Sequence, residues 1–307
     1  MKSLCMLLVL WSLSAPAAPV ARVMATTTLL ADVVRAVAGP DLPVAALLPV
    51  DTDPHAFTPT PREVARLAEA DLVFVNGLGL ESFLGDLLAV AGTGRVVVAS
   101  RTITPRVLEG DGEEAHGGEG HVHTAACRHE GAEDPHVWFD PIQVQAWTDV
   151  ISATLAARYP DQADGFRTRA AAYRARLQEL DTWARGRLAA LPPARRQLVT
   201  DHNAFGYFAA RYDFKVVGCV LPGFSTAAET SARDLARLHD LVRASGVKSI
   251  FVEQASEPAV AGRLAAATGV QLLTLPTCSL SGPAGPAPTY EAYFRHVVET
   301  VARGLER

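Results

Sequence analysis

The sequence predicts an α/β protein with two similar lobes, each built on a mainly parallel sheet, joined by one long rigid helix. Short apolar runs alternate with helical patterns in both halves of the 307-residue chain, as they do in βαβ units. Between the halves, one amphipathic pattern continues without a break from about 162 to 190. Three histidines in similar Asp-containing motifs lie far apart in the sequence, so only the fold can bring them together.

The first 17 residues have the features of a secretory signal peptide. Lys2 precedes an apolar run at 5–11, and Ala15-Pro16-Ala17 supplies small residues for cleavage. The run is too short to span a membrane, although a retained N-terminal anchor is the alternative. We therefore expect an exported protein. The net charge of −5, without a basic patch, argues against a nucleic-acid partner.

We place the N-terminal lobe at residues 18–160. Its strands are expected at 22–26, 43–49, 72–75 and 95–99. Its helices are expected at 29–38, from Pro61 onward, at 81–90 and at 142–159. Gly39-Pro40 is a helix stop signal, and Pro61 is suited to the first position of a helix. This alternation predicts a parallel sheet, whose ligands bind beyond the carboxyl ends of the strands.

The alternation stops in a loop at 109–133, which is rich in Gly, Asp and Glu. Its low hydrophobicity and high charge predict disorder. The loop contains four histidines: His116, His121, His123 and His129. Because His-rich tracts bind transition metals, we expect weak, exchangeable metal binding here. A solvated loop with incidental histidines is the alternative.

A linking helix is predicted at 161–191, and the C-terminal lobe at 192–307. A helix of this length spans about 40 Å, more than one small domain needs. Few charge pairs favour a coiled coil, so we expect a strut between lobes in a monomer. The C-terminal strands are expected at 196–200, 215–221, 249–252 and 270–275. The C-terminal helices are expected at 204–211, 231–244, 258–267 and 290–305.

The candidate metal ligands are His55, His136 and His202. Two of them occur in Asp-Pro-His and the third in Asp-His-Asn. Proline fixes the local backbone, and a nearby Asp can accept the hydrogen bond that sets the imidazole tautomer. His55 and His202 each follow a predicted strand, which places both at carboxyl ends. Alternatively, each histidine is an ordinary turn residue.

The motifs resemble those of periplasmic solute-binding proteins of zinc and manganese ABC importers. The matching segments are 53–61, 76–81, 134–141, 201–208 and 250–253. The resemblance implies two α/β lobes joined by a long helix, a metal site in the interlobe cleft, and delivery to a membrane permease. The His-rich loop is similar to that of the zinc-specific members. A periplasmic metallochaperone is a further candidate partner.

The fourth ligand departs from the family pattern. The resemblance implies a carboxylate from the loop after the last strand, but 274–280 contains none, and the next acid is Glu291. The alternatives are a water molecule or one of the side chains of Asp51, Asp53, Glu229, Glu253 and Cys278. Asp134, Asp140 and Asp201 are expected to hold rings or turns rather than the metal.

The cysteines allow a second role for Cys278. An exported chain keeps Cys127, Cys219 and Cys278, and an oxidising compartment favours disulfides. Cys219 and Cys278 both lie at the ends of predicted C-terminal strands, so we expect them to pair. The odd number leaves one thiol that is free or binds metal.

The predicted function is periplasmic binding of Zn²⁺ as the transported ligand, not enzymatic catalysis. Three imidazoles favour zinc over manganese, which prefers carboxylate oxygen. A manganese-binding protein of the same family is the first alternative. A zinc hydrolase with Glu253 as general base is the second, but the sequence contains no other hydrolase motif. A purely structural zinc site is the third.

Overall fold

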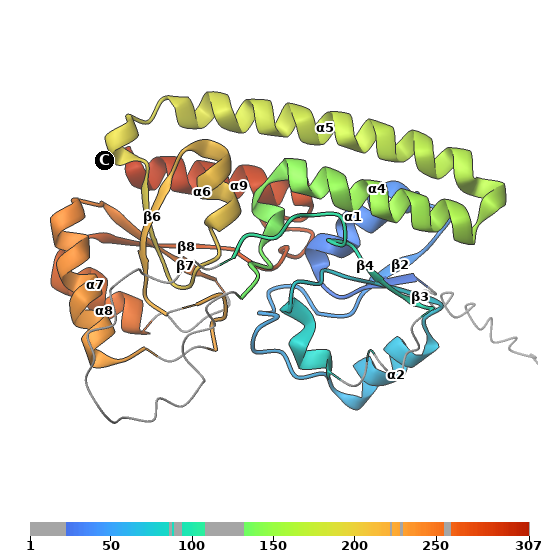
Figure 1. The fold of residues 1–307 in the computed structure, drawn as a ribbon, viewed down its shortest axis with the longest axis horizontal. Coiled ribbons are helices and arrows are strands. Elements are labelled where there is room, and N and C mark those ends of the chain that lie inside the picture. The colour runs from blue at the N-terminus through green and yellow to red at the C-terminus, as the bar shows by residue number, and fades with distance from the viewer. Residues whose placement is uncertain are drawn as a thin grey trace, which may run out of the picture.

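Two four-stranded parallel sheets form the centres of two lobes, and a layer of long helices lies across both of them (Figure 1). The computed structural model describes residues 23–85, 88, 94–107, 132–221, 223–227, 230–254 and 259–306. The predicted fold class is confirmed. The predicted signal peptide, the His-rich loop with its four histidines, Cys127 and Glu229 lie outside the described residues, apart from the last two positions of the loop.

The N-terminal lobe contains the sheet with strand order β2-β1-β3-β4. Its strands are β1 (Val23–Ala25), β2 (Val44–Ala46), β3 (Leu72–Val75) and β4 (Val96–Val98). Its helices are α1 (Thr28–Ala38), α2 (Pro61–Glu69) and the 3-10 helix η1 (Leu80–Leu84). All pairings are parallel. The carboxyl ends of the strands therefore meet at one edge of the sheet, where the β2 loop carries His55.

Most helix boundaries of this lobe follow the local sequence signals. The Thr27 hydroxyl accepts a hydrogen bond from the backbone N–H of Leu30 and caps α1. Gly39, with a φ of 80°, ends that helix. The predicted helix at 81–90 differs in its first part, where Leu80–Leu84 forms a 3-10 helix that ends at Gly85, with a φ of 35°, and positions 85 and 88 are again helical. Part of the remaining range lies outside the described residues.

The C-terminal lobe contains the sheet with strand order β6-β5-β7-β8, also parallel throughout. Its strands are β5 (Gln197–Thr200), β6 (Lys215–Cys219), β7 (Ser249–Glu253) and β8 (Gln271–Leu275). Its helices are α6 (Gly206–Tyr212), α7 (Ala232–Ser245), α8 (Ala259–Thr268) and α9 (Tyr290–Leu305). These elements agree with the predicted ones to within a few residues.

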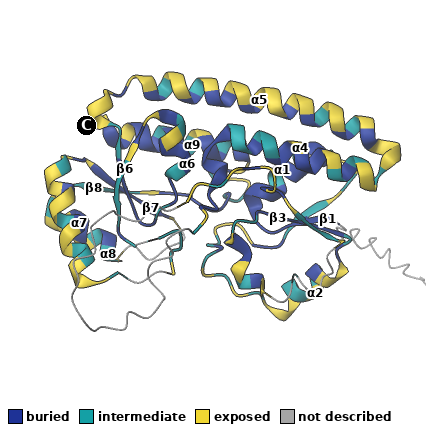
Figure 2. Cartoon of the chain, in the orientation of Figure 1, coloured by how far each residue is buried: buried dark blue, intermediate teal, exposed yellow. Residues whose placement is uncertain are grey.

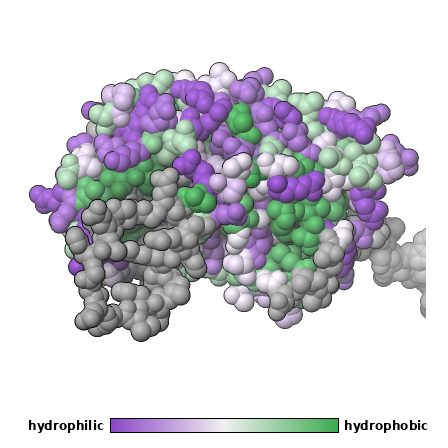
Figure 3. Space-filling view, in the orientation of Figure 1, coloured by the Kyte–Doolittle hydropathy of each residue, from purple (hydrophilic) through white to green (hydrophobic). Residues whose placement is uncertain are grey.

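Two long helices follow one another in the chain, and the second of them links the lobes. They are α4 (Pro141–Arg158) and α5 (Ala163–Ala189), with the 3-10 turns η2 (Val137–Phe139), η3 (Pro160–Gln162) and η4 (Pro193–Arg195) around them. The 27 residues of α5 span about 40 Å. This helix packs on α1 and α4 at one end and on α9 at the other. Its inner face is buried and its outer face exposed (Figure 2), and hydrophilic side chains are frequent along that edge (Figure 3).

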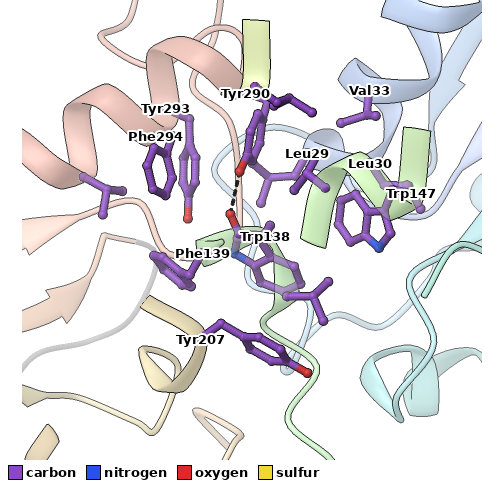
Figure 4. Packing of buried hydrophobic residues seen from close by; sticks show 14 of the residues in the cluster. Leu29, Leu30, Val33, Trp138, Phe139, Trp147, Tyr207, Tyr290, Tyr293 and Phe294 are labelled. Atoms are coloured by element: carbon purple, nitrogen blue, oxygen red, sulfur yellow. Dashed lines mark hydrogen bonds between the residues drawn. The ribbon is translucent and has the colours of Figure 1, made fainter. Parts of the chain in front are cut away.

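One hydrophobic core extends across both lobes, with the η2 segment near its centre. Trp138 and Phe139 pack there against Tyr290 and Tyr293 of α9 (Figure 4). The Trp138 ring N–H donates to the carbonyl of Thr277 at 2.7 Å, and the Tyr290 hydroxyl donates to the carbonyl of Trp138 at 2.8 Å. These bonds satisfy buried polar groups that would otherwise be costly. They also fix the segment that follows His136 against the C-terminal lobe.

The predicted disulfide between Cys219 and Cys278 is wrong, because both cysteines are free. Cys219 ends β6, and Cys278 follows β8, and these strands occupy opposite edges of the sheet. With neighbouring strands about 4.8 Å apart, the two edges are separated by roughly 14 Å. A disulfide requires Cα atoms within about 7 Å. The sequence reveals that both residues follow strands, but it does not reveal the strand order.

Among the residues described, no helix is both long enough and apolar enough to cross a membrane.

Candidate metal centre

Three histidine side chains from three segments converge between the lobes. His55 lies on the loop after β2, His136 directly precedes η2, and His202 follows β5. The Nε2 atom of His136 is 3.2 Å from Nε2 of His55 and 3.2 Å from Nε2 of His202. His136 and His202 are fully buried, and His55 is partly exposed. The structure thus brings together the three histidines that the motifs single out.

Two aspartates fix the orientation of the two buried rings. Asp134 Oδ1 accepts hydrogen bonds from the backbone N–H and from ring Nδ1 of His136, both at 2.9 Å. Asp201 Oδ1 accepts the equivalent pair from His202, at 2.8 and 2.9 Å. A carboxylate partner at Nδ1 assigns the proton to that nitrogen and leaves the Nε2 lone pair free. Both free lone pairs face the centre.

Asp53 acts on His55 in a different way. Its Oδ1 accepts the backbone N–H of His55 at 2.9 Å, which fixes the turn rather than the ring. Its Oδ2 accepts a hydrogen bond from the hydroxyl of Thr226, which lies on the loop after β6 in the other lobe. The His55 loop is therefore attached to the C-terminal lobe.

The surroundings favour neutral rings at two of the three positions. Burial, with a contribution from His202, lowers the pKa of His55 to about 4. Burial also lowers the pKa of His136 well below its usual value. At His202, burial opposes protonation, but the Asp201 carboxylate outweighs it and raises the pKa. At Asp201 itself, burial is outweighed by the His202 ring, and the pKa is lowered.

The convergence of the Nε2 atoms has a direct electrostatic consequence. Neutral rings arranged in this way direct lone pairs at one another across 3.2 Å, and this is repulsive unless a cation or a proton lies between them. One proton can bridge only one of these contacts, whereas one metal ion can bind all three nitrogens. Tetrahedral zinc, with Zn–N bonds of about 2.0–2.1 Å, separates its nitrogen ligands by about 3.3 Å. The two separations of 3.2 Å from His136 Nε2 match this value.

Cys278 is the fourth member of the group. Its Sγ and the three histidine nitrogens all lie within 4.8 Å of one another, and no other described residue belongs to this group. The side chain is buried, at 2% exposure, and burial raises the pKa of its thiol well above the usual value. It is carried by the loop after β8, where the resemblance implies a carboxylate.

Glu253 holds that loop in place. Its Oε2 accepts the backbone N–H groups of Thr277 and Cys278, both at 2.9 Å. Its own backbone N–H donates to Asp201 Oδ2 at 2.6 Å. Asp201 therefore connects His202 to the strand that supports the Cys278 loop. Of the other candidates, Asp51 donates its backbone N–H to the carbonyl of Leu280 at 3.4 Å and is not part of the group.

Two residues near the centre were not predicted from the sequence. The Phe224 ring lies 6.2 Å from the His136 ring, centroid to centroid, and the Trp138 ring lies 5.2 Å from the same His136 ring. Thr226 contacts Asp53 as described above. Both residues lie on the loop that follows β6. The rule that places ligands beyond the carboxyl ends of parallel strands would have pointed to this loop.

Two α/β lobes joined by a long helix, with histidines of both lobes converging between them, define a metal-binding solute-binding protein. The chain belongs to the ZnuA family, described as zinc-uptake complex component A, periplasmic, which matches residues 23–304. It is thus a periplasmic metal-binding component of the ABC metal importers.

The known relatives bind different metals according to their names. The manganese-binding lipoprotein MntA of Bacillus subtilis is 33% identical, over 93% of this chain and 90% of its own length. The zinc-binding protein TroA of Treponema pallidum is 32% identical, over 93% of this chain and 89% of its own length. The solved structure of periplasmic TroA superposes with a TM-score of 0.81 at 31% identity, covering 93% of this chain and 99% of that chain.

Proposed function

We propose that this protein binds Zn²⁺ through His55, His136 and His202 and delivers it to the membrane permease of an ABC importer. The observation that carries this proposal is the convergence of three Nε2 atoms, with contacts of 3.2 Å. The Asp134 and Asp201 carboxylates support it, because they hold two rings with their lone pairs toward the centre. Because both lobes contribute ligands, binding of the ion changes the contacts between the lobes, and a partner protein can recognise this change.

Manganese is the second candidate, because a relative of this chain is named as a manganese-binding protein. The nitrogen spacing does not decide between the two metals, since adjacent ligands of a six-coordinate ion lie at a similar separation. The donor types favour zinc. Imidazole suits zinc, whereas manganese prefers carboxylate, carbonyl and water oxygens, and its affinity for most sites is lower.

Hydrolysis by a zinc-bound water is less well supported. The family is one of transporter binding proteins. Glu253, the candidate general base, already accepts two backbone N–H groups and is 2% exposed. A general base needs a position within hydrogen-bond reach of the attacking water. Esterase activity of the zinc-loaded protein that disappears on chelation would support this alternative.

The direct test is a titration of Zn²⁺ and Mn²⁺ into the metal-free protein and into His136→Ala. We expect one tight zinc site in the parent, weaker manganese binding, and loss of the tight zinc site in His136→Ala. His239→Ala is the matched control, since His239 pairs with Asp240 on α7, away from the centre. Tight zinc binding that survives in His136→Ala would contradict the proposal.

A further inference from the structure

We propose that Cys278 supplies a thiolate as the fourth ligand, which makes this a three-histidine, one-cysteine site that selects Zn²⁺ and related soft dications over Mn²⁺. This inference rests on the proposed metal-binding function and concerns the same centre.

The position of the sulfur atom favours a bond to the metal. Sγ of Cys278 shares a region 4.8 Å across with the ring nitrogens of His55, His136 and His202. In tetrahedral zinc sites the Zn–S bond is about 2.3 Å, so a sulfur ligand lies roughly 3.6 Å from each nitrogen. A small closure of the loop or of the His55 turn brings the four atoms to that spacing.

The Cys278 loop is held by hydrogen bonds to several surrounding elements. Glu253 accepts the backbone N–H groups of Thr277 and Cys278. The carbonyl of Thr277 accepts the Trp138 ring N–H and the Tyr293 hydroxyl, both at 2.7 Å. These contacts come from both lobes and from the core, so the side chain between them has a defined direction. Such support is typical of a ligand-bearing loop.

Contacts on the far side of Cys278 continue this pattern. The backbone N–H of Leu280 donates to the Thr28 hydroxyl at 2.9 Å, and the hydroxyls of Thr28 and Ser279 are 3.2 Å apart. Thr28 belongs to α1 of the N-terminal lobe. The short segment that carries Cys278 is therefore anchored to both lobes.

The nearby carboxylates have other roles. Asp53 uses one oxygen for the His55 backbone and the other for Thr226. Glu253 accepts the two backbone N–H groups of the Cys278 loop. The next acid along the chain, Glu291, pairs with Arg176 at 2.9 Å. Within the described part of the chain, the converging group contains no carboxylate.

Binding of the Cys278 sulfur to the metal requires loss of the thiol proton. The thiol loses its proton to solvent as the sulfur–metal bond forms, so the bound zinc keeps one net positive charge. Coordination to a metal deprotonates a thiol outright. Thiolate sulfur is a soft donor that favours zinc and disfavours manganese, for which carboxylate oxygen is the better donor. Replacing a carboxylate with Cys278 therefore shifts the site toward zinc.

A buried cysteine can also act only as a small apolar side chain, and the experiment separates the two roles. Co²⁺ is used as the probe, because a thiolate–Co²⁺ bond gives a sulfur-to-metal charge-transfer band in the near ultraviolet. The protein is compared with Cys278→Ser, Cys278→Asp and the control Cys219→Ser. Cys219 is also free, but it lies at the end of β6, outside the converging group.

We expect the charge-transfer band in the parent and in Cys219→Ser and its absence in Cys278→Ser. Loss of residues that merely support a metal ligand costs about 10–100-fold in affinity, so Cys278→Ser should weaken Zn²⁺ binding by at least that factor. Cys278→Asp should reduce the Zn²⁺-to-Mn²⁺ affinity ratio by tenfold or more. Its circular dichroism spectrum without metal should match that of the parent.

Two results overturn the inference. Co²⁺ bound by the parent without a charge-transfer band shows that sulfur is not a ligand, and this result needs no variant to fold. The same conclusion follows if the Zn²⁺ affinity and the Mn²⁺ affinity each have the same value in the parent, Cys278→Ser and Cys278→Asp. Both leave the three-histidine site intact. If the parent binds no metal, or if His136→Ala binds it equally well, the proposed function fails as well.

Discussion

Asp201 Oδ1 accepts hydrogen bonds from the backbone N–H and the ring Nδ1 of His202, at 2.8 and 2.9 Å. Asp201 Oδ2 accepts the backbone N–H of Glu253 at 2.6 Å. One carboxylate therefore sets the tautomer of a candidate ligand and fixes the strand that supports the Cys278 loop. Asp201 therefore joins the His202 ring to strand β7, although it is not one of the four converging residues.

We predict that Asp201→Asn weakens zinc binding about 10–100-fold without removing a ligand, because an amide has only one acceptor oxygen and cannot accept from both the His202 ring and the Glu253 backbone N–H. Isothermal titration measures this change. Asp240→Asn is the control, since Asp240 is a solvent-exposed partner of His239 with a similar 3.1 Å contact. Unchanged zinc affinity in Asp201→Asn would show that the ring needs no such support.

Thr226→Val should weaken zinc binding by about three- to tenfold. The change removes the hydroxyl that donates to Asp53 and so frees the turn that presents His55. A single hydrogen bond contributes about 1 kcal/mol net, which sets this range. Stopped-flow release of zinc to a chelator should be faster to a similar degree. Thr182→Val is the control, because its hydroxyl bonds only within α5. Slower zinc release in Thr226→Val would contradict the role of this contact.

The long helix α5 makes a separate, pH-dependent contribution to stability. Asp181 accepts hydrogen bonds from Arg211 and from the hydroxyl of Tyr212, both on α6. Burial opposes ionisation of Asp181, but the Arg211 guanidinium outweighs it, and the pKa falls below 3.8. Because the folded pKa is lower than the unfolded one, this stabilisation is present above about pH 4 and is lost at lower pH.

Asp181→Asn should therefore lower the melting temperature by a few degrees at pH 7, since hydrogen bonds to charged groups contribute about 1.5–3 kcal/mol. The difference from the parent should shrink as the pH falls below 4. Calorimetry at several pH values checks both points. Asp164→Asn is the control, because Asp164 forms an exposed pair with Arg167 on the same helix. A difference that is constant with pH would contradict the ionic role of Asp181.

The sequence predicted the α/β lobes and the linking helix well, because each element has local signals. Apolar runs between Gly and Pro residues mark the strands, and the periodic apolar face of α5 remains unbroken over 27 residues. His55 and His202 were placed near each other by a general property of parallel sheets. His136 lies in neither sheet and was singled out only by its Asp-Pro-His motif.

The remaining features depend on contacts that local patterns do not encode. The order of strands in the second sheet places Cys219 and Cys278 at opposite edges, so the predicted disulfide does not form. Glu253 and Thr226 act through hydrogen-bond partners that are distant in the sequence. Thr277 is 24 residues from Glu253, and Asp53 is 173 residues from Thr226. The helix predicted at 81–90 begins as a 3-10 helix at Leu80–Leu84, which ends at Gly85, and the sequence pattern does not distinguish this tighter turn from an α-helix.

A crystal structure of the zinc-loaded protein, with anomalous scattering recorded at the zinc edge, tests whether His55, His136 and His202 bind one zinc ion. We expect one strong anomalous peak at about 2.0–2.1 Å from the Nε2 atoms of His55, His136 and His202. A principal peak elsewhere in the molecule, with these three rings unligated, would contradict it.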